Sequence, residues 1–225
     1  MNILKSMIST TIIMILVFFV SILVYGYSYY NRVKQERPLD KTIEYIQSHE
    51  DYIEIEEISP YFLNAIVAIE DRRFFKHSGL DAIGIFRAVV SNIRAGEIVQ
   101  GGSTISQQLA KNLFFTSQRT WVRKVAEMFM TLDIEKNFNK EEILEIYSNV
   151  IYFGKGNYGV YSASKEYFGK DPIKLNLNES AFIAGLTQSP TAYTNDIELG
   201  IERQREVIKA LEDFEQVKFD NIVIQ

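Results

Sequence analysis

The chain has 225 residues and a net charge of −5, and 47% of its residues are hydrophobic. This length allows one domain with an appendage, and the hydrophobic content is sufficient for a packed core. The absence of cysteine excludes disulfides and thiolate catalysis, and two histidines argue against a zinc site.

The N-terminal segment is strongly apolar. Residues 6–31 carry no charge, and these 26 residues exceed the roughly 20 that a helix needs to cross a bilayer core. Tyrosines cluster over residues 25–30, as in an interfacial aromatic belt. A cleaved signal peptide is the alternative, but its apolar run would be shorter and small residues would follow. We therefore predict that residues 1–30 form a cytoplasmic tip and a retained transmembrane anchor of a single-pass membrane protein.

The charges that flank this anchor indicate its orientation only weakly. Lys5 precedes the apolar run, whereas Arg32, Lys34 and Arg37 follow it. The positive-inside rule alone leans toward a cytoplasmic C-terminal domain. The polar and charged residues 31–51 are typical of a stalk.

Residues 52–212 read as one globular domain, and residues 213–225 as a C-terminal tail. The domain opens with a brief apolar–polar alternation over residues 52–58, which predicts a short strand or an extended lead-in. Ser59 and Pro60 then begin a helix that carries Glu70 at its far end.

Further helices follow in the chain order. Asp81 caps a helix that ends near Gly96. Capping boxes, which pair a polar N-cap with Glu or Gln three residues later, predict three more helices. These begin at Thr104, Asn139 and Asn176. Apolar spacing predicts a long helix over residues 119–136 and a last helix over about 200–212, whereas Pro190 halts the run before it. The expected fold class is mainly α.

An acid-free stretch lies inside this acidic chain. Residues 98–126 contain no Asp or Glu but carry four basic residues, Lys111, Arg119, Arg123 and Lys124. Such a local excess of positive charge beside a glycine turn (residues 101–102) suits an anionic, sugar-like ligand, for instance a pyrophosphate.

Polar side chains in the same stretch strengthen this interpretation. Gln107, Gln108 and Lys111 share one helix face. Ser103 and Thr104 lie at the N-terminus of that helix, where free amides favour anions. An ordinary glycine turn before a polar helix face is the alternative interpretation.

Two carboxylates bracket the basic stretch. Glu70 ends an apolar helix, a setting suited to a general base, although a solvated helix end has the same sequence. Glu127 follows Arg123 and Lys124 at helical spacing, which predicts either a surface ion-pair ladder or a carboxylate held in a basic groove. We interpret His77 as structural, holding a turn through a ring hydrogen bond.

Five segments, in order and suitably spaced, resemble the motifs of the peptidoglycan glycosyltransferases (family 51). They are EDRRFFKHSGLD (residues 70–81), GGSTISQQLAKN (101–112), RKVAE (123–127), EEILEIYSN with the following YFGKG (141–156) and AGLTQSP (184–190). The resemblance covers residues 58–193 or so. Without a penicillin-binding domain, the chain is similar to the monofunctional, membrane-anchored members.

The resemblance implies a lysozyme-like transglycosylase domain with a small membrane-proximal subdomain. It implies polymerisation of lipid II into β-1,4-linked glycan strands on the extracytoplasmic side of the cell membrane, with inversion at C1 and release of undecaprenyl diphosphate. This location overrides the orientation that the charge count favours. Glu70 matches the general base. Four residues match positions that bind or stabilise the pyrophosphate-sugar end: Lys111, Arg119, Lys124 and Glu127. Of these, Glu127 is expected to be catalytic, as Glu70 is. Three match positions that line the donor site: Ser103, Gln107 and Gln108.

The same resemblance sets the expected cofactors and partners. No cofactor is required and no metal site is assigned, although Mg or Mn stimulates some members. The expected partners are lipid II, the growing glycan strand, the membrane and other wall-synthesis proteins, with no nucleic acid. Thr187 departs from the pattern, because the family often has proline there, and a usual proline is missing after Tyr193. We expect these departures to affect the C-terminal edge of the domain and not the chemistry.

Two other functions fit parts of the sequence. A lysozyme-like hydrolase or lytic transglycosylase uses similar carboxylates, but it needs an acid near the leaving oxygen and has little use for four cations. A non-catalytic membrane-anchored scaffold for wall synthesis would gain nothing from carboxylates that flank a basic groove.

Overall fold

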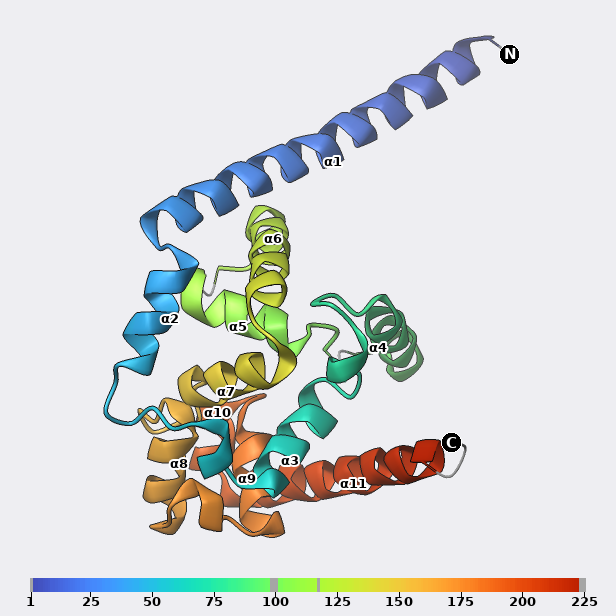
Figure 1. The fold of residues 1–225 in the computed structure, drawn as a ribbon. Helices are drawn as coiled ribbons and strands as arrows, with labels where there is room; N and C mark the ends of the chain where they lie inside the picture. Colours follow the sequence, from blue (N-terminus) through green and yellow to red (C-terminus); the bar gives the residue numbers. More distant parts are fainter. Residues whose placement is uncertain (1, 98–100, 117, 223–225) are drawn as a thin grey trace.

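The computed structural model describes residues 2–97, 101–116 and 118–222 (Figure 1). These residues form helices and no β-strand, as expected of a mainly α fold. The helices, in chain order, are α1 (Asn2–Glu36), α2 (Leu39–Gln47), η1 (Ile55–Glu57), α3 (Pro60–Glu70), η2 (Phe74–Lys76), α4 (Ala82–Ala95), α5 (Ile105–Phe114), α6 (Trp121–Asn137), α7 (Lys140–Val150), α8 (Gly159–Phe168), η3 (Pro172–Lys174), α9 (Leu177–Leu186), α10 (Pro190–Asn195) and α11 (Ile197–Ile222).

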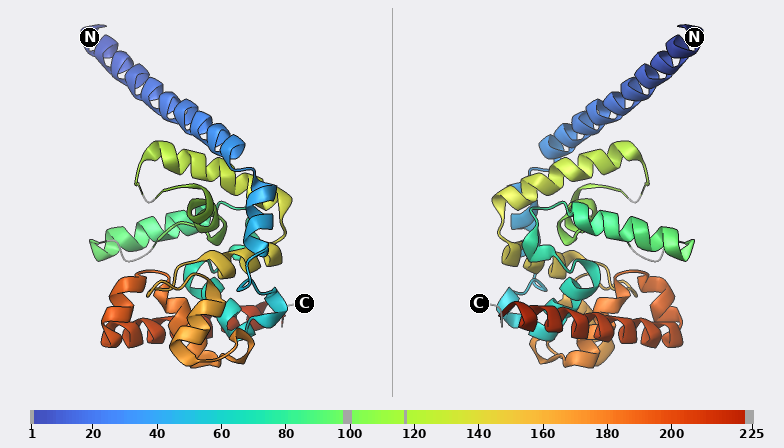
Figure 2. Two further views of the ribbon diagram at one scale, coloured as in Figure 1. Left: turned by 90° about the vertical axis from the view of Figure 1, so that its left-hand side faces the viewer. Right: turned by 90° about the vertical axis from the view of Figure 1, so that its right-hand side faces the viewer.

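Two groups of helices share one hydrophobic core. In the first group, α3, α9 and α11 pack against one another, and in the second, α5 packs against both α6 and α7 (Figures 1 and 2). Fully buried side chains from both groups belong to a single apolar cluster, among them Phe62, Leu109, Met130, Tyr147 and Ile183. Burial of such side chains supplies most of the stabilisation of a domain of this kind.

The capping signals of the sequence correspond to real helix ends. Capping boxes begin α5, α7 and α9 at the predicted N-caps. Asp81 caps α4 by accepting a hydrogen bond from the backbone N–H of Ile83, and Gly96 ends that helix with a φ of 72°. Such a left-handed conformation favours glycine. Helix α3 begins at Pro60 and brings Glu70 to its last turn, as predicted.

Of the two alternatives for residues 52–58, the strand is wrong, and the extended lead-in holds only for the residues before Ile55. Residues Ile55–Glu57 form a short 3₁₀ helix instead. The backbone of Ile53 pairs with a side chain: its N–H donates to Asn149 Oδ1 at 3.0 Å and its C=O accepts from Asn149 Nδ2 at 2.9 Å. Because this amide satisfies both groups, the segment needs no partner strand, and Glu54 keeps an extended backbone just before the 3₁₀ helix.

Two expectations near the C-terminus also need correction. Helix α9 ends at Leu186, before Pro190, but Pro190 also begins a new helix, α10, because the first residue of a helix needs no backbone N–H for a helical hydrogen bond. Helix α11 is longer than the predicted 200–212, since it begins at Ile197 and continues to Ile222. It therefore extends into residues 213–225, the predicted tail, while the boundaries of the domains stay predictions.

Helix α1 runs away from the body, and its C-terminal part lies along α6 (Figures 1 and 2). Within the described residues it is the one helix long and apolar enough to cross a membrane, over the 32 residues Lys5–Glu36. Gly26 lies against Val125 of α6 with no space for a side chain. Lys34 forms an ion pair with Asp133 at 2.6 Å. The first residues of the predicted stalk thus continue the anchor helix and dock it on the domain.

Helix α4 projects from the body as an arm (Figure 2). Its apolar side chains are mostly uncovered, with Phe86 70% and Ile93 75% exposed, whereas Ala88 is buried. Trp121, the first residue of α6, is 76% exposed as well. An exposed apolar surface of this kind marks a contact with a membrane or a partner, which fits the expected membrane-proximal subdomain.

Candidate active site

Two adjoining cavities contain the residues singled out in the sequence. The larger, of about 460 Å³, is lined by the end of α3, by α4, by residues 101–104 and by parts of α11. The smaller, of about 270 Å³, lies between α5 and the start of α6. Ser103 and Gln108 line both. We call the larger one the Glu70 cavity and the smaller one the basic groove.

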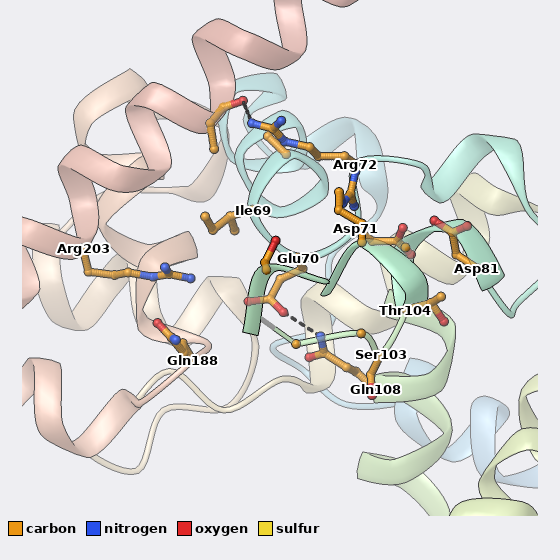
Figure 3. A pocket seen from close by; sticks show the side chains of 17 residues that line it. Ile69, Glu70, Asp71, Arg72, Asp81, Ser103, Thr104, Gln108, Gln188 and Arg203 are labelled. Atoms are coloured by element: carbon orange, nitrogen blue, oxygen red, sulfur yellow. Dashed lines mark hydrogen bonds between the residues drawn. The ribbon is translucent and has the colours of Figure 1, made fainter. Parts of the chain in front are cut away.

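Glu70 lies in the wall of its cavity, between Gln188 and Arg203 on one side and Ser103 and Gln108 on the other (Figure 3). Both of its carboxylate oxygens accept hydrogen bonds from neutral side chains. Gln108 Nε2 donates to Oε2 at 2.6 Å, and Thr187 Oγ1 lies 2.6 Å from Oε1. Glu70 forms no ion pair with any described cation, so its carboxylate is free to accept a proton from a ligand.

The orientation of Gln108 is set from behind by Tyr147. The Tyr147 hydroxyl donates to Gln108 Oε1 at 3.0 Å, which turns the amide nitrogen toward Glu70. Burial, reinforced by the charges of Glu70 and Asp71, raises the pKa of Tyr147 well above its usual value. The phenol therefore stays protonated and remains a donor, and Gln108 in turn can only donate to Glu70.

The turn that follows Glu70 is fixed by Asp71 and His77. The backbone N–H of Gly79 donates to His77 Nδ1 at 3.2 Å, so the ring proton lies on Nε2, which donates to Asp71 at 3.0 Å. Asp71 Oδ2 also accepts from the backbone N–H of Ile105, at the start of α5, at 3.1 Å. The structural interpretation of His77 is confirmed, and Asp71 joins the end of α3 to the start of α5.

This arrangement changes the expected role of the α5 N-terminus. We expected free amides there to bind an anion, but Asp71 accepts from Ile105 and the Thr104 hydroxyl accepts from the N–H of Gln107. Gln107 is 2% exposed, and its carbonyl oxygen accepts from the Thr104 N–H in the capping box. Gln107 therefore lines the basic groove mainly as a helix cap, with only its amide nitrogen left for a ligand.

The basic groove contains one buried carboxylate among several cations. Glu127 is 1% exposed, and its two oxygens accept separately from Arg123 and Lys124. Lys124 also donates to Ser103 Oγ at 3.1 Å, which links α6 to the turn before α5. These contacts favour a carboxylate held in a basic groove over a surface ion-pair ladder, the two interpretations that the sequence left open for Glu127.

Lys111 and Arg119 complete the groove and are both exposed. Neither forms an ion pair with any described residue. Four cations thus face a single carboxylate, and the groove carries a net positive charge that is open to solvent. The acid-free stretch extends beyond the groove, and its residues 98–100 and 117 lie outside the described part of the chain.

The structure brings Ser103, Gln107, Gln108, Lys111, Arg119, Lys124 and Glu127 together in the groove and places Glu70 in the adjoining cavity. No group of three or more acidic or histidine side chains among the described residues could hold a metal ion. The metal requirement itself stays a prediction.

Several lining residues were missed by the sequence reasoning. Gln188 and Arg203 lie on the far side of Glu70, and Arg72 and Arg87 line the same cavity (Figure 3). The Nε of Arg203 is buried without a hydrogen-bond partner in the described structure, although its guanidinium also binds Glu206 at 2.7 Å. Residue spacing gave no signal for Arg203, which comes from α11, more than a hundred residues after Glu70.

Comparisons with known proteins agree with this geometry. A family model described as Transglycosylase matches residues 36–212. The chain is 46% identical over 162 residues to penicillin-binding protein 1A of Aquifex aeolicus, a match that covers 71% of this chain and 22% of that protein. It is 45% identical over 141 residues to penicillin-binding protein 1A of Escherichia coli, with 63% and 17% covered.

A relative of similar length also matches. A Cupriavidus necator protein named "Putative transglycosylase" is 43% identical over 157 residues, which cover 70% of this chain and 68% of that protein. The chain thus spans about a fifth of the length of the penicillin-binding relatives but most of this one. The apolar helix α1 and these relatives together indicate a membrane-anchored protein. The matched family and the helical structure confirm the expected lysozyme-like fold class, and the chain belongs to the transglycosylase family.

Proposed function

We propose that the chain is a peptidoglycan glycosyltransferase that polymerises lipid II into β-1,4-linked glycan strands and releases undecaprenyl diphosphate. The observation that carries the proposal is the pairing of the two cavities. One holds a carboxylate that is bound only by neutral groups, and the adjoining one holds an excess of positive charge.

The chemistry follows from this pairing. Glu70 removes the proton of the 4-hydroxyl of the acceptor sugar, and the freed oxygen attacks C1 of the donor sugar from the opposite side to the leaving group. The C1–O bond breaks and its electron pair leaves with the diphosphate, so the configuration at C1 is inverted. A diphosphate leaves without being protonated. Lys111 and Arg119 are exposed and can bind its negative charge.

The acceptor would occupy the Glu70 cavity. Its volume of about 460 Å³ suits a sugar ring with part of its substituents. The buried Nε–H of Arg203, which has no partner in the described part of the protein, suits an oxygen atom of this ligand. We place the growing glycan strand, as donor, at the basic groove.

A cell-wall hydrolase is the competing function, and the contacts of Glu127 argue against it. A hydrolase of the lysozyme type needs a carboxylic acid that protonates the leaving oxygen, beside a second carboxylate. Both oxygens of Glu127 accept hydrogen bonds from cations, so this residue is held as an acceptor. We infer that Glu127 keeps Arg123 and Lys124 in place and supplies no proton.

The membrane location follows from the substrate. The exposed apolar faces of α1 and α4 can enter a bilayer, which would keep both cavities close to the lipid-linked sugars. We propose that the domain lies on the extracytoplasmic side, as the family resemblance implies, with residues 1–30 as its anchor.

One experiment separates the candidate functions. The full-length chain in lipid vesicles is incubated with purified lipid II, and in parallel with isolated sacculi. We expect glycan polymer and stoichiometric undecaprenyl diphosphate from lipid II, and no soluble fragments from sacculi. Fragments from sacculi would indicate a hydrolase, and absence of both products would favour a scaffold. Repeating the first reaction with a chelator, Mg or Mn tests whether a divalent ion stimulates it.

A further inference from the structure

The Thr187 hydroxyl lies between two acceptors. Its Oγ1 is 2.6 Å from Glu70 Oε1 and 2.8 Å from the backbone carbonyl oxygen of Ala184. A hydroxyl has one proton to donate and two lone pairs that accept, and its hydrogen rotates freely about the C–O bond. Thr187 can therefore donate to only one of these two oxygens at a time.

The second partner of Glu70 has no such choice. Gln108 presents its amide nitrogen to Oε2, because Tyr147 donates to its carbonyl oxygen from the other side. An amide nitrogen donates and does not accept. Gln108 thus stabilises the ionised carboxylate alone, whereas Thr187 can bind either protonation state.

We propose that Thr187 is a positioning residue that binds Glu70 in both of its protonation states; the inference rests on the proposed function. While Glu70 is ionised, Thr187 donates to Oε1. When Glu70 has become a carboxylic acid, the hydroxyl hydrogen turns to the Ala184 carbonyl, and Thr187 Oγ1 accepts from the protonated Oε1.

The proton balance of the reaction favours such a partner. The 4-hydroxyl O–H bond breaks and a new O–H bond forms on the Glu70 carboxyl, while the electron pair of O4 forms the bond to C1. The carboxyl must then pass its proton to water before the next cycle. A partner that can only donate opposes the first of these steps, and one that can reverse its hydrogen bond opposes neither.

The backbone holds Thr187 in position for this exchange. It follows directly after the buried Leu186 at the end of α9, in a helical conformation with φ −55° and ψ −32°. The Ala184 carbonyl belongs to the last turn of the same helix. Switching therefore rotates the Thr187 hydroxyl hydrogen toward Ala184 as the proton that Glu70 gains turns toward Thr187, and it leaves the heavy atoms of both residues in place.

Two substitutions test the proposal. Thr187→Val has nearly the same shape but no hydroxyl, and Thr187→Ser keeps the hydroxyl. Thr194→Val serves as the matched control, since Thr194 lies in α10 and its hydroxyl donates only to backbone carbonyls of that same helix. Lipid II polymerisation in vesicles is followed for all three and for the unsubstituted chain, with kcat and KM measured across a range of pH.

We expect Thr187→Val to lower kcat by about tenfold, the loss that one hydrogen bond to a charged group produces, with KM for lipid II little changed. A hydrogen bond donated to an ionised carboxylate is stronger than one accepted from the neutral acid, so the substitution destabilises the ionised form more, and the acidic limb of the kcat profile of Thr187→Val moves to higher pH. The other charged or titratable groups at this cavity are retained: Asp71, Arg72, Asp81, Arg87, Tyr147 and Arg203. Thr187→Ser and Thr194→Val should behave like the unsubstituted chain.

The outcomes are distinguishable from failure of the proposed function. If the unsubstituted chain makes no polymer from lipid II, the function itself is wrong. If it does, and Thr187→Val retains kcat and the same pH profile, the role of Thr187 is refuted. A loss in Thr187→Val that Thr187→Ser does not restore, or that appears with a lower melting temperature and an unshifted pH profile, assigns Thr187 to structure alone and also overturns the proposal.

Discussion

The Glu70 cavity and the basic groove share Ser103 and Gln108 but hold their charged groups in opposite ways. Glu70 is bound by an amide and a hydroxyl, both neutral, and the amide is fixed by a further hydrogen bond from Tyr147. In the groove, Glu127 is bound by two cations, while Lys111 and Arg119 stay exposed and unpaired in the described structure.

This difference corresponds to two chemical tasks. A base must accept a proton, and a cation bound to it would oppose the reaction because it stabilises the ionised carboxylate. Neutral donors orient the carboxylate with a smaller effect on its ability to accept the proton. A site for a departing diphosphate needs positive charge in place beforehand, and one carboxylate keeps neighbouring cations from moving apart. The function of the Glu70 cavity therefore depends on the position of one carboxylate, whereas in the basic groove several cations together bind the diphosphate.

Glu70→Gln should have the largest effect. The amide has almost the same shape but cannot take a proton at neutral pH, so polymerisation should fall by about a thousandfold, a typical contribution of a general base. The measurement is the initial rate of polymer formation in vesicles, together with thermal unfolding.

Glu166→Gln, on the exposed face of α8, is the matched control and should retain full activity. A Glu70→Gln variant that folds normally and polymerises at more than about a tenth of the usual rate would contradict the assignment of Glu70 as base.

Removal of one exposed cation should have a smaller effect, because the others remain. We expect Lys111→Ala and Arg119→Ala each to lower kcat/KM for lipid II by roughly 10- to 100-fold, the contribution of one charge-assisted hydrogen bond to a phosphate. The double variant should lose more than either alone. Steady-state kinetics with lipid II in vesicles provide the measurement.

Lys136→Ala removes an exposed cation from the far end of α6 and should leave the kinetics unchanged. Equal kinetics for Lys111→Ala, Arg119→Ala and Lys136→Ala would exclude the groove as the diphosphate site.

The comparison also explains which parts of the site the sequence could predict. Charge excess and capping boxes are local patterns, so the cations of the groove and the starts of α5, α7 and α9 could be read from short segments. Thr187 looked like a departure without effect on the chemistry, yet it contacts Glu70. That contact joins residues 117 positions apart, and only the packing of α3 on α9 creates it.

The fold shows the same limit. Local apolar alternation suggested a strand at residues 52–58, but the Asn149 side chain, far along the chain, satisfies the backbone there. The apolar spacing over residues 119–136 predicted helix α6 but not which of its faces is buried in the core. Val125 and Phe129 face α1, whereas the core side of α6 is formed by Ala126, Met130 and Ile134.

A moderate effect is expected from Tyr147→Phe, which tests how the cavity is held in place. Without the hydroxyl, the Gln108 amide can turn over and present its oxygen to Glu70. We expect kcat to fall by about three- to tenfold, as for loss of one buried neutral hydrogen bond, with KM little changed. Steady-state kinetics provide the measurement, and Tyr161→Phe on α8 is the control. An unchanged kcat in Tyr147→Phe would show that Gln108 is oriented without Tyr147.

The smallest effect should come from the contact between the anchor and the groove. Gly26 of α1 lies against Val125, which is next to Lys124 and two residues from Glu127, so Gly26→Leu must push α1 away from α6. We expect a two- to fivefold lower rate in vesicles, because overpacking at this contact shifts α6 only slightly. Val24→Leu adds bulk to the exposed face of the same helix and should have no effect. If both variants polymerise lipid II at the usual rate, α1 acts only as a tether. If Gly26→Leu alone is slow, the position of the groove cations depends on the docked anchor helix. The basic groove would then rely on a contact outside it, as the Glu70 cavity relies on Tyr147.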